Sequence, residues 1–127
     1  MSVEIAAMME KPATDALATA RTVGPRGVWL KLVNEVLSLA GPHAELLSHS
    51  ERPWSSVTFT GTRHLIALAF PGSDAPARVE AYREALPEHE FAIARHFVAD
   101  AAISFIEHEA TGRGVTVHTE LLVLEDA

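Results

Sequence analysis

Two apolar runs on either side of a short, glycine-containing break make residues 97–124 the stretch that most constrains how this chain can fold. Both runs, 97–109 and 115–124, contain many β-branched and aromatic residues, which is typical of a long β-hairpin. The segment Leu121–Leu124 is apolar at every position. A strand of that kind is covered on both faces, so we expect it centrally in a sheet or in a subunit interface.

A helix is the alternative for part of this region. Apolar residues between Phe91 and Glu109 also recur at helical spacing, which fits one helix of about 20 residues. The enrichment in phenylalanine, isoleucine and valine favours strands instead, and the strand over 115–124 needs neighbours. We therefore predict strands here, including a short one over 90–94.

Upstream, the sequence predicts two amphipathic helices. The first carries an apolar stripe from Trp29 to Ala40 and ends at Gly41-Pro42, a glycine cap followed by a residue that cannot continue the helix. The second has its apolar residues at Val79, Tyr82 and Leu86 and stops before Pro87.

A hairpin is predicted between these helices, over Trp54 to Phe70. Gly61-Thr62 suits a two-residue turn with glycine first, which would pair Phe59 with His64 and leave the apolar residues on one face. Residues 43–53 are expected to hold one more helical turn and a loop.

Together these elements predict an α+β fold. Along the chain the elements follow the order α-β-β-α-β-β-β. The strands form an antiparallel sheet of about five strands, with two or three helices packed on one face. Residues 1–23 form an alanine-rich helical arm interrupted by Pro12, and residues 24–127 form a single α+β domain. The helices can cover one face of the sheet, so we expect the other face to meet a second copy in a homodimer.

Charge and composition narrow the classes of partner. The net charge is −7 and Lys11 and Lys31 are the two lysines, which argues against binding to nucleic acid or to an anionic membrane. The chain has no cysteine, which removes disulfides and thiolate ligands. Without an apolar run of about 18 residues or a basic leader, a soluble, cytoplasmic protein is expected.

Histidine is the residue type that most suggests chemistry, with seven in 127 residues. Four lie within 89–118, so we select His96, His108 and His118 as candidate ligand-binding residues and the last two as candidate metal ligands. The hairpin register decides whether His118 faces His108, with Glu120 nearby, or Glu107. The spacing matches no metal-binding motif such as HExxH, so a polar stripe on an outer sheet face is the ordinary explanation.

Two further residues complete the predicted site. Asp100 lies among alanines and valine, a context that raises a carboxyl pKa, although such residues often only accept backbone hydrogen bonds. Arg26 precedes the first clear helix, where a helix N-terminus favours an anion, but an ordinary connector also fits.

The leading functional hypothesis is a small accessory or ligand-binding domain, homodimeric, with a small-molecule ligand in an apolar pocket and no cofactor. An enzyme that uses the histidine and aspartate cluster for acid–base or metal-assisted chemistry is the second hypothesis. A protein-interaction module that acts through its acidic surface or its N-terminal arm is the third.

Overall fold

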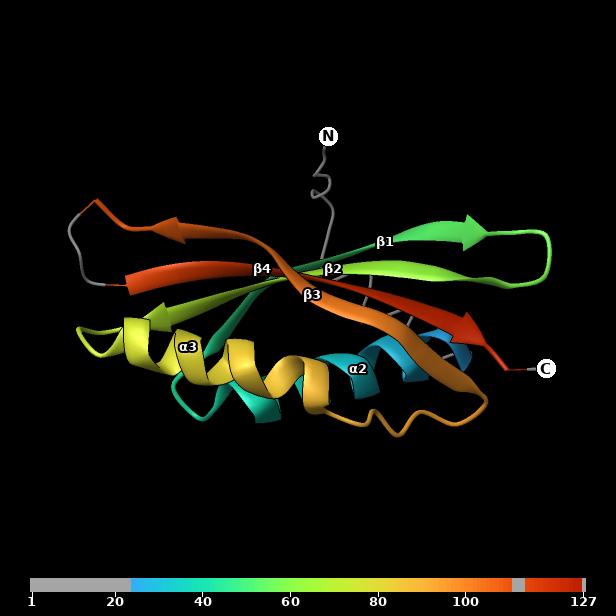
Figure 1. The fold of residues 1–127 in the computed structure, drawn as a ribbon, viewed down its shortest axis with the longest axis horizontal. Coiled ribbons are helices and arrows are strands. Elements are labelled where there is room, and N and C mark those ends of the chain that lie inside the picture. Colours follow the sequence, from blue (N-terminus) through green and yellow to red (C-terminus); the bar gives the residue numbers. More distant parts are fainter. Residues whose placement is uncertain (1–23, 111–113, 127) are drawn as a thin grey trace.

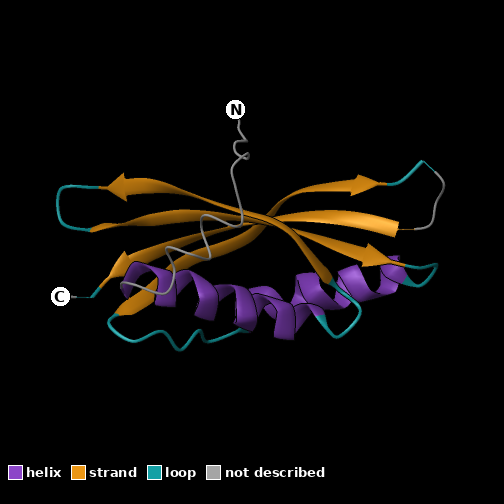
Figure 2. Ribbon diagram, turned by 180° about the vertical axis from the view of Figure 1, so that it is seen from behind, coloured by secondary structure: helices purple, strands orange, loops and turns teal. Residues whose placement is uncertain are grey.

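The computed structural model describes residues 24–110 and 114–126, and these form an α+β fold, as predicted. In chain order the elements are α2 (Gly24–Ala40), β1 (Glu45–Ser55), β2 (Thr60–Pro71), α3 (Ala75–Ala85), the short 3-10 helix η1 (Leu86–Glu88), β3 (His96–His108) and β4 (Gly114–Glu125). The strands form one antiparallel sheet in the order β1-β2-β4-β3. Both helices lie on the same face of this sheet (Figures 1 and 2).

The described chain consists of two αββ units joined through the middle of the sheet. α2 precedes the β1–β2 hairpin and α3 precedes the β3–β4 hairpin, while the pairing of β2 with β4 connects the two hairpins. β4 therefore lies centrally, which confirms the prediction made from its two apolar faces. Residues 91–109 include the strand β3, so the helical alternative for that segment is wrong.

The sheet has four strands in the described residues, and the fifth strand predicted over 90–94 is wrong. This segment is a loop that is tied to α2. The backbone N–H of Ala92 donates to the Glu35 carboxylate at 3.1 Å, and His89 contacts the same carboxylate at 2.7 Å. Ile93 meanwhile turns into the core. A side chain of α2 thus satisfies the backbone donor that a neighbouring strand would otherwise use.

The first hairpin exists, but its predicted turn and register are wrong. Ser55 pairs with Thr60 and the turn occupies residues 56–59, so the chain reverses earlier than Gly61-Thr62. β1 extends over 45–55, which also corrects the helical turn expected within 43–53. The helix α2 begins at Gly24, with Pro25 in its first turn, and is followed by Gly41 at φ 99° as predicted. The predicted arm over 1–23 lies outside the described residues.

The core lies between the helices and the inner face of the sheet. Alternate residues of β2 and β4 are buried against α2 and α3, which is the two-layer arrangement of an open-faced sheet. A buried hydrogen bond of 2.7 Å joins the hydroxyls of Tyr82 on α3 and Thr119 on β4. Each of these two hydroxyls has a hydrogen-bond partner, so the burial of the pair costs little free energy.

Gly61 fixes the position of β2 against β4. It pairs with Trp54 on one side and Leu124 on the other, and a Cβ atom at this position would lie 2.2 Å from the Val123 carbonyl oxygen. The glycine is therefore required by close approach of the two backbones, not by a turn.

Substitution Gly61→Ala should lower the free energy of unfolding by about 1–3 kcal/mol, because the new methyl group has to displace backbone atoms of β4. Gly27→Ala is the matched control, since nothing lies within 4 Å of the added Cβ and α2 gains a better helix former there. That control should stabilise the protein by about 0.5–1 kcal/mol. Urea unfolding followed by circular dichroism measures both, and a neutral Gly61→Ala would contradict this packing.

Candidate functional site

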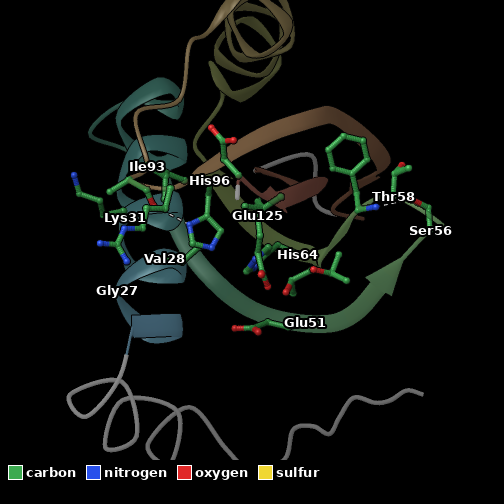
Figure 3. Close-up of a pocket in the computed structure, with 18 of the residues that line it drawn as sticks. Gly27, Val28, Lys31, Glu51, Ser56, Thr58, His64, Ile93, His96 and Glu125 are labelled. Atoms are coloured by element: carbon green, nitrogen blue, oxygen red, sulfur yellow. Dashed lines mark hydrogen bonds between the residues drawn. The ribbon is translucent and has the colours of Figure 1, made fainter.

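A pocket of about 1090 Å³ lies at one end of the sheet, between α2 and the β1–β2 turn (Figure 3). Gly27, Val28 and Lys31 form its wall on α2. The loop 93–96 and the end of β4 close it from the other αββ unit. The pocket therefore depends on both units being packed together on one sheet.

Two histidines lie in direct contact beside this pocket, and His64 lines it. His49 on β1 and His64 on β2 face the helices, and the distance from Nε2 of the first ring to Nδ1 of the second is 2.8 Å. One ring N–H donates to the lone pair of the other, so the pair is stable when both imidazoles are neutral. His64 is only 2% exposed.

The strand register brings a carboxylate to the same place. Glu51 is directly opposite His64 in the β1–β2 ladder, and His49 is two residues earlier on the same strand and therefore on the same face. The ligand atoms of these three residues all lie within 4.8 Å of one another. We call His49, Glu51 and His64 the inner triad.

An aromatic stack holds the triad from the helix side. The Trp29 indole on α2 stacks on the His49 ring with centroids 4.9 Å apart and planes 15° from parallel. The two imidazoles continue the stack at 5.1 Å. Because Trp29 occupies one face of His49, the ring has little freedom to rotate away from His64.

Burial sets the protonation of the triad. It lowers the pKa of His49 to about 3, with repulsion from His64 as the second cause. Burial also lowers the pKa of His64 to about 4, with His96 as the second cause. The same loss of water raises the pKa of Glu51, whose side chain still reaches solvent. Near pH 7 the two rings are therefore neutral and keep their lone pairs.

A third histidine, His96, faces the pocket from the first position of β3 (Figure 3). Its Nδ1–H donates to the Ala94 carbonyl oxygen at 2.8 Å, which orients the ring. The preceding residue, Arg95, has φ 65°, an unusual backbone conformation for a residue with a side chain. Its carbonyl accepts a hydrogen bond from Asp126, so the end of β4 fixes this bend.

The residues selected from the sequence lie in different places. His96 lines the pocket, whereas Asp100 is exposed on β3, in register with Leu122. His108 is exposed at the far end of that strand, opposite Val115. The strand register pairs His118 with Phe105, so neither of the two predicted registers is correct. The His118 ring still contacts the Glu107 carboxylate at 2.9 Å on the outer face, diagonally across the two strands.

Arg26 belongs to the first turn of α2, and its side chain lies outside the described part of the structure. His108 and His118, the two predicted metal ligands, lie at different positions along the β3–β4 ladder, so the structure does not bring them together.

Sequence reasoning missed the inner triad. His49 and Glu51 lie in a segment whose composition predicts a loop. The turn predicted at Gly61-Thr62 pairs His64 with Phe59, whereas the structure pairs it with Glu51. The available signal was the pattern His49-Ser50-Glu51, since residues two apart share one face of a strand. Recognising it requires knowing first that β1 is a strand.

Comparison with protein-family models, with curated proteins and with solved structures finds no match for this chain. Within residues 24–110 and 114–126, neither helix combines the length and apolarity that crossing a bilayer requires. The function is therefore argued from the site alone.

The depressed pKa values of His49 and His64 give a prediction for stability in acid. Both rings bind protons near pH 6.5 in the unfolded chain but only near 3–4 in the folded one, so stability is fully present above about pH 6.5. It should fall below that pH by up to about 1.4 kcal/mol per pH unit for each ring. Urea unfolding with a chelator between pH 4.5 and 7.5 measures the slope.

His49→Gln should reduce this acid slope, because it removes one of the two groups that gain a proton on unfolding. His108→Gln is the matched control, since that ring is exposed, and it should leave the slope unchanged. Equal slopes for the wild type and His49→Gln would contradict the neutral pair.

Proposed function

We propose that this chain is a small-molecule-binding domain that holds an amphipathic ligand in the pocket between α2 and the β1–β2 turn. The observation that carries this proposal is the contrast between two sides of one cavity, an apolar side and a side with imidazole and carboxyl groups. Ligand sites commonly combine a mostly apolar wall with a few convergent polar groups.

The apolar side comes from both αββ units. Val28 on α2, Phe59 in the β1–β2 turn and Ile93 in the loop before β3 line the cavity. Phe59 is 44% exposed and touches Phe97 edge-to-face, with ring centroids 6.0 Å apart. An exposed aromatic ring beside a cavity is a favourable surface for an apolar ligand body, since covering it removes the ring from water.

The polar side offers both donors and acceptors. His64 and His96 present imidazoles, Glu51 presents a carboxyl group, and Lys31 and Arg95 supply cations at the rim. Glu125 and Asp126 balance these cations. A ligand with a small hydrogen-bonding head and an apolar body satisfies this arrangement, and the cavity of about 1090 Å³ accommodates a molecule of drug-like size.

The neutral fluorescent amine N-phenyl-1-naphthylamine tests the proposal, because it has an apolar body and one N–H donor. It should bind the full-length protein saturably, with one molecule per chain, and Phe59→Ser should weaken binding by about 10-fold through loss of ring contact. Phe105→Ser is the matched control, since this ring is 57% exposed on β3, away from the pocket. Binding that Phe105→Ser abolishes and Phe59→Ser leaves intact would contradict the pocket.

We also propose a homodimer through the outer face of the sheet, which neither α2 nor α3 covers (Figure 2). Its charges are partly paired within the chain, as Arg63 with Glu120 and His118 with Glu107, beside the apolar side chains of Leu65 and Phe105. Four strands about 4.8 Å apart and about 12 residues long span roughly 760 Å². That approaches the roughly 800 Å² that each partner contributes to a standard interface.

The same two phenylalanine variants test the dimer. Sedimentation equilibrium at micromolar concentration should give twice the chain mass of 13.7 kDa for the wild type and for Phe59→Ser. Phe105→Ser should shift the equilibrium toward the monomer. A monomeric wild type would exclude a second copy as the cover of this face.

A further inference from the structure

We propose that His49, Glu51 and His64 form a binding site for a divalent transition-metal ion beside the pocket, which Glu51 and His64 line. The ligand class is Zn²⁺ or another first-row ion that accepts two imidazole nitrogens and one carboxylate oxygen. The proposal stands on the triad itself and is independent of the small-molecule proposal, because its test uses the metal alone.

The backbone brings the three side chains close to the spacing that an ion requires. Zinc lies about 2.0–2.2 Å from imidazole nitrogen and carboxylate oxygen, so ligand atoms in a tetrahedral site are about 3.3 Å apart. The three ligand atoms of the triad lie within 4.8 Å of one another, so the widest pair has to close by at most about 1.5 Å. The ring nitrogens of His49 and His64 are 2.8 Å apart and would separate by about 0.5 Å. Side-chain rotations accommodate both adjustments without a change in strand register.

The contact between the two imidazoles suits a shared ion. At 2.8 Å, a ring nitrogen of His49 and a ring nitrogen of His64 are directed at each other, so both converge on one point. When the ion enters, the ring that donates its N–H changes tautomer, so that its proton moves to its other nitrogen by exchange with water. The charge of the ion is offset by the Glu51 carboxylate.

The neighbours of the triad are those expected around a metal ligand set. Trp29 stacks on His49 and holds its ring orientation. His96 lines the same pocket, and its ring is oriented by the hydrogen bond from Nδ1 to the Ala94 carbonyl. Three protein ligands leave at least one position for water or for a ligand from the pocket, as in catalytic rather than structural zinc sites.

Isothermal titration of ZnCl₂ into the full-length, chelator-treated protein at pH 7.5 is the test. One Zn²⁺ per chain should bind, and Glu51→Gln should raise the Kd by about 10-fold or more because the anionic ligand is lost. Glu51 reaches solvent, so this variant retains the fold, which circular dichroism verifies. Glu125→Gln is the matched control, an exposed glutamate of the same pocket outside the triad, and should leave the Kd within about 2-fold.

Co²⁺ provides a second readout that does not depend on heat. Its visible absorption bands should appear on binding to the wild type and weaken in His49→Gln, while the double variant His108→Gln/His118→Gln should retain them. Absence of saturable 1:1 zinc binding overturns the proposal. So does binding that Glu51→Gln leaves unchanged, or that the double variant removes.

Discussion

The register of the β1–β2 hairpin is the constraint on which the site depends. Because side chains alternate between faces, a slip of one residue would turn His49 and Glu51 to the outer face and separate them from His64. Gly61 belongs to both ladders of β2, since it pairs with Trp54 on β1 and with Leu124 on β4, and a side chain there would meet the backbone of β4. The pairing of β2 with β4 then brings the end of β4 and the start of β3, with His96, to the same pocket.

Burying the two imidazoles of the inner triad costs free energy that an apolar core would not cost. An apolar pair at positions 49 and 64 would pack against Trp29 without the cost of removing imidazoles from water. The N–H···N hydrogen bond between the rings offsets part of that cost, but only while neither ring is protonated. Polar groups that a core does not need for packing are commonly found where a ligand is bound, and the cavity beside these rings agrees with that.

Sequence reasoning succeeded where periodicity was strong. The apolar stripe of α2 and the two apolar faces of β4 located both elements, because burial leaves a clear pattern in them. It failed on β1, which carries Ser, His, Glu, Arg and Pro53 and so reads as a loop. An edge strand tolerates such residues, since one side of its backbone has no partner in the described sheet. Gly61 was misread for a related reason, because close backbone approach and turns both select glycine. Missing β1 meant missing two members of the triad.

Nitrogen NMR of the imidazole rings tests the contact between His49 and His64 most directly. In ¹⁵N-labelled, metal-free protein at pH 7, a scalar coupling across the hydrogen bond should connect Nε2 of His49 with Nδ1 of His64, and both rings should show neutral chemical shifts. The rings should stay neutral as the pH falls through 6.5 to about 5. Two uncoupled rings that gain protons near pH 6.5 would contradict the register, the burial and the site together.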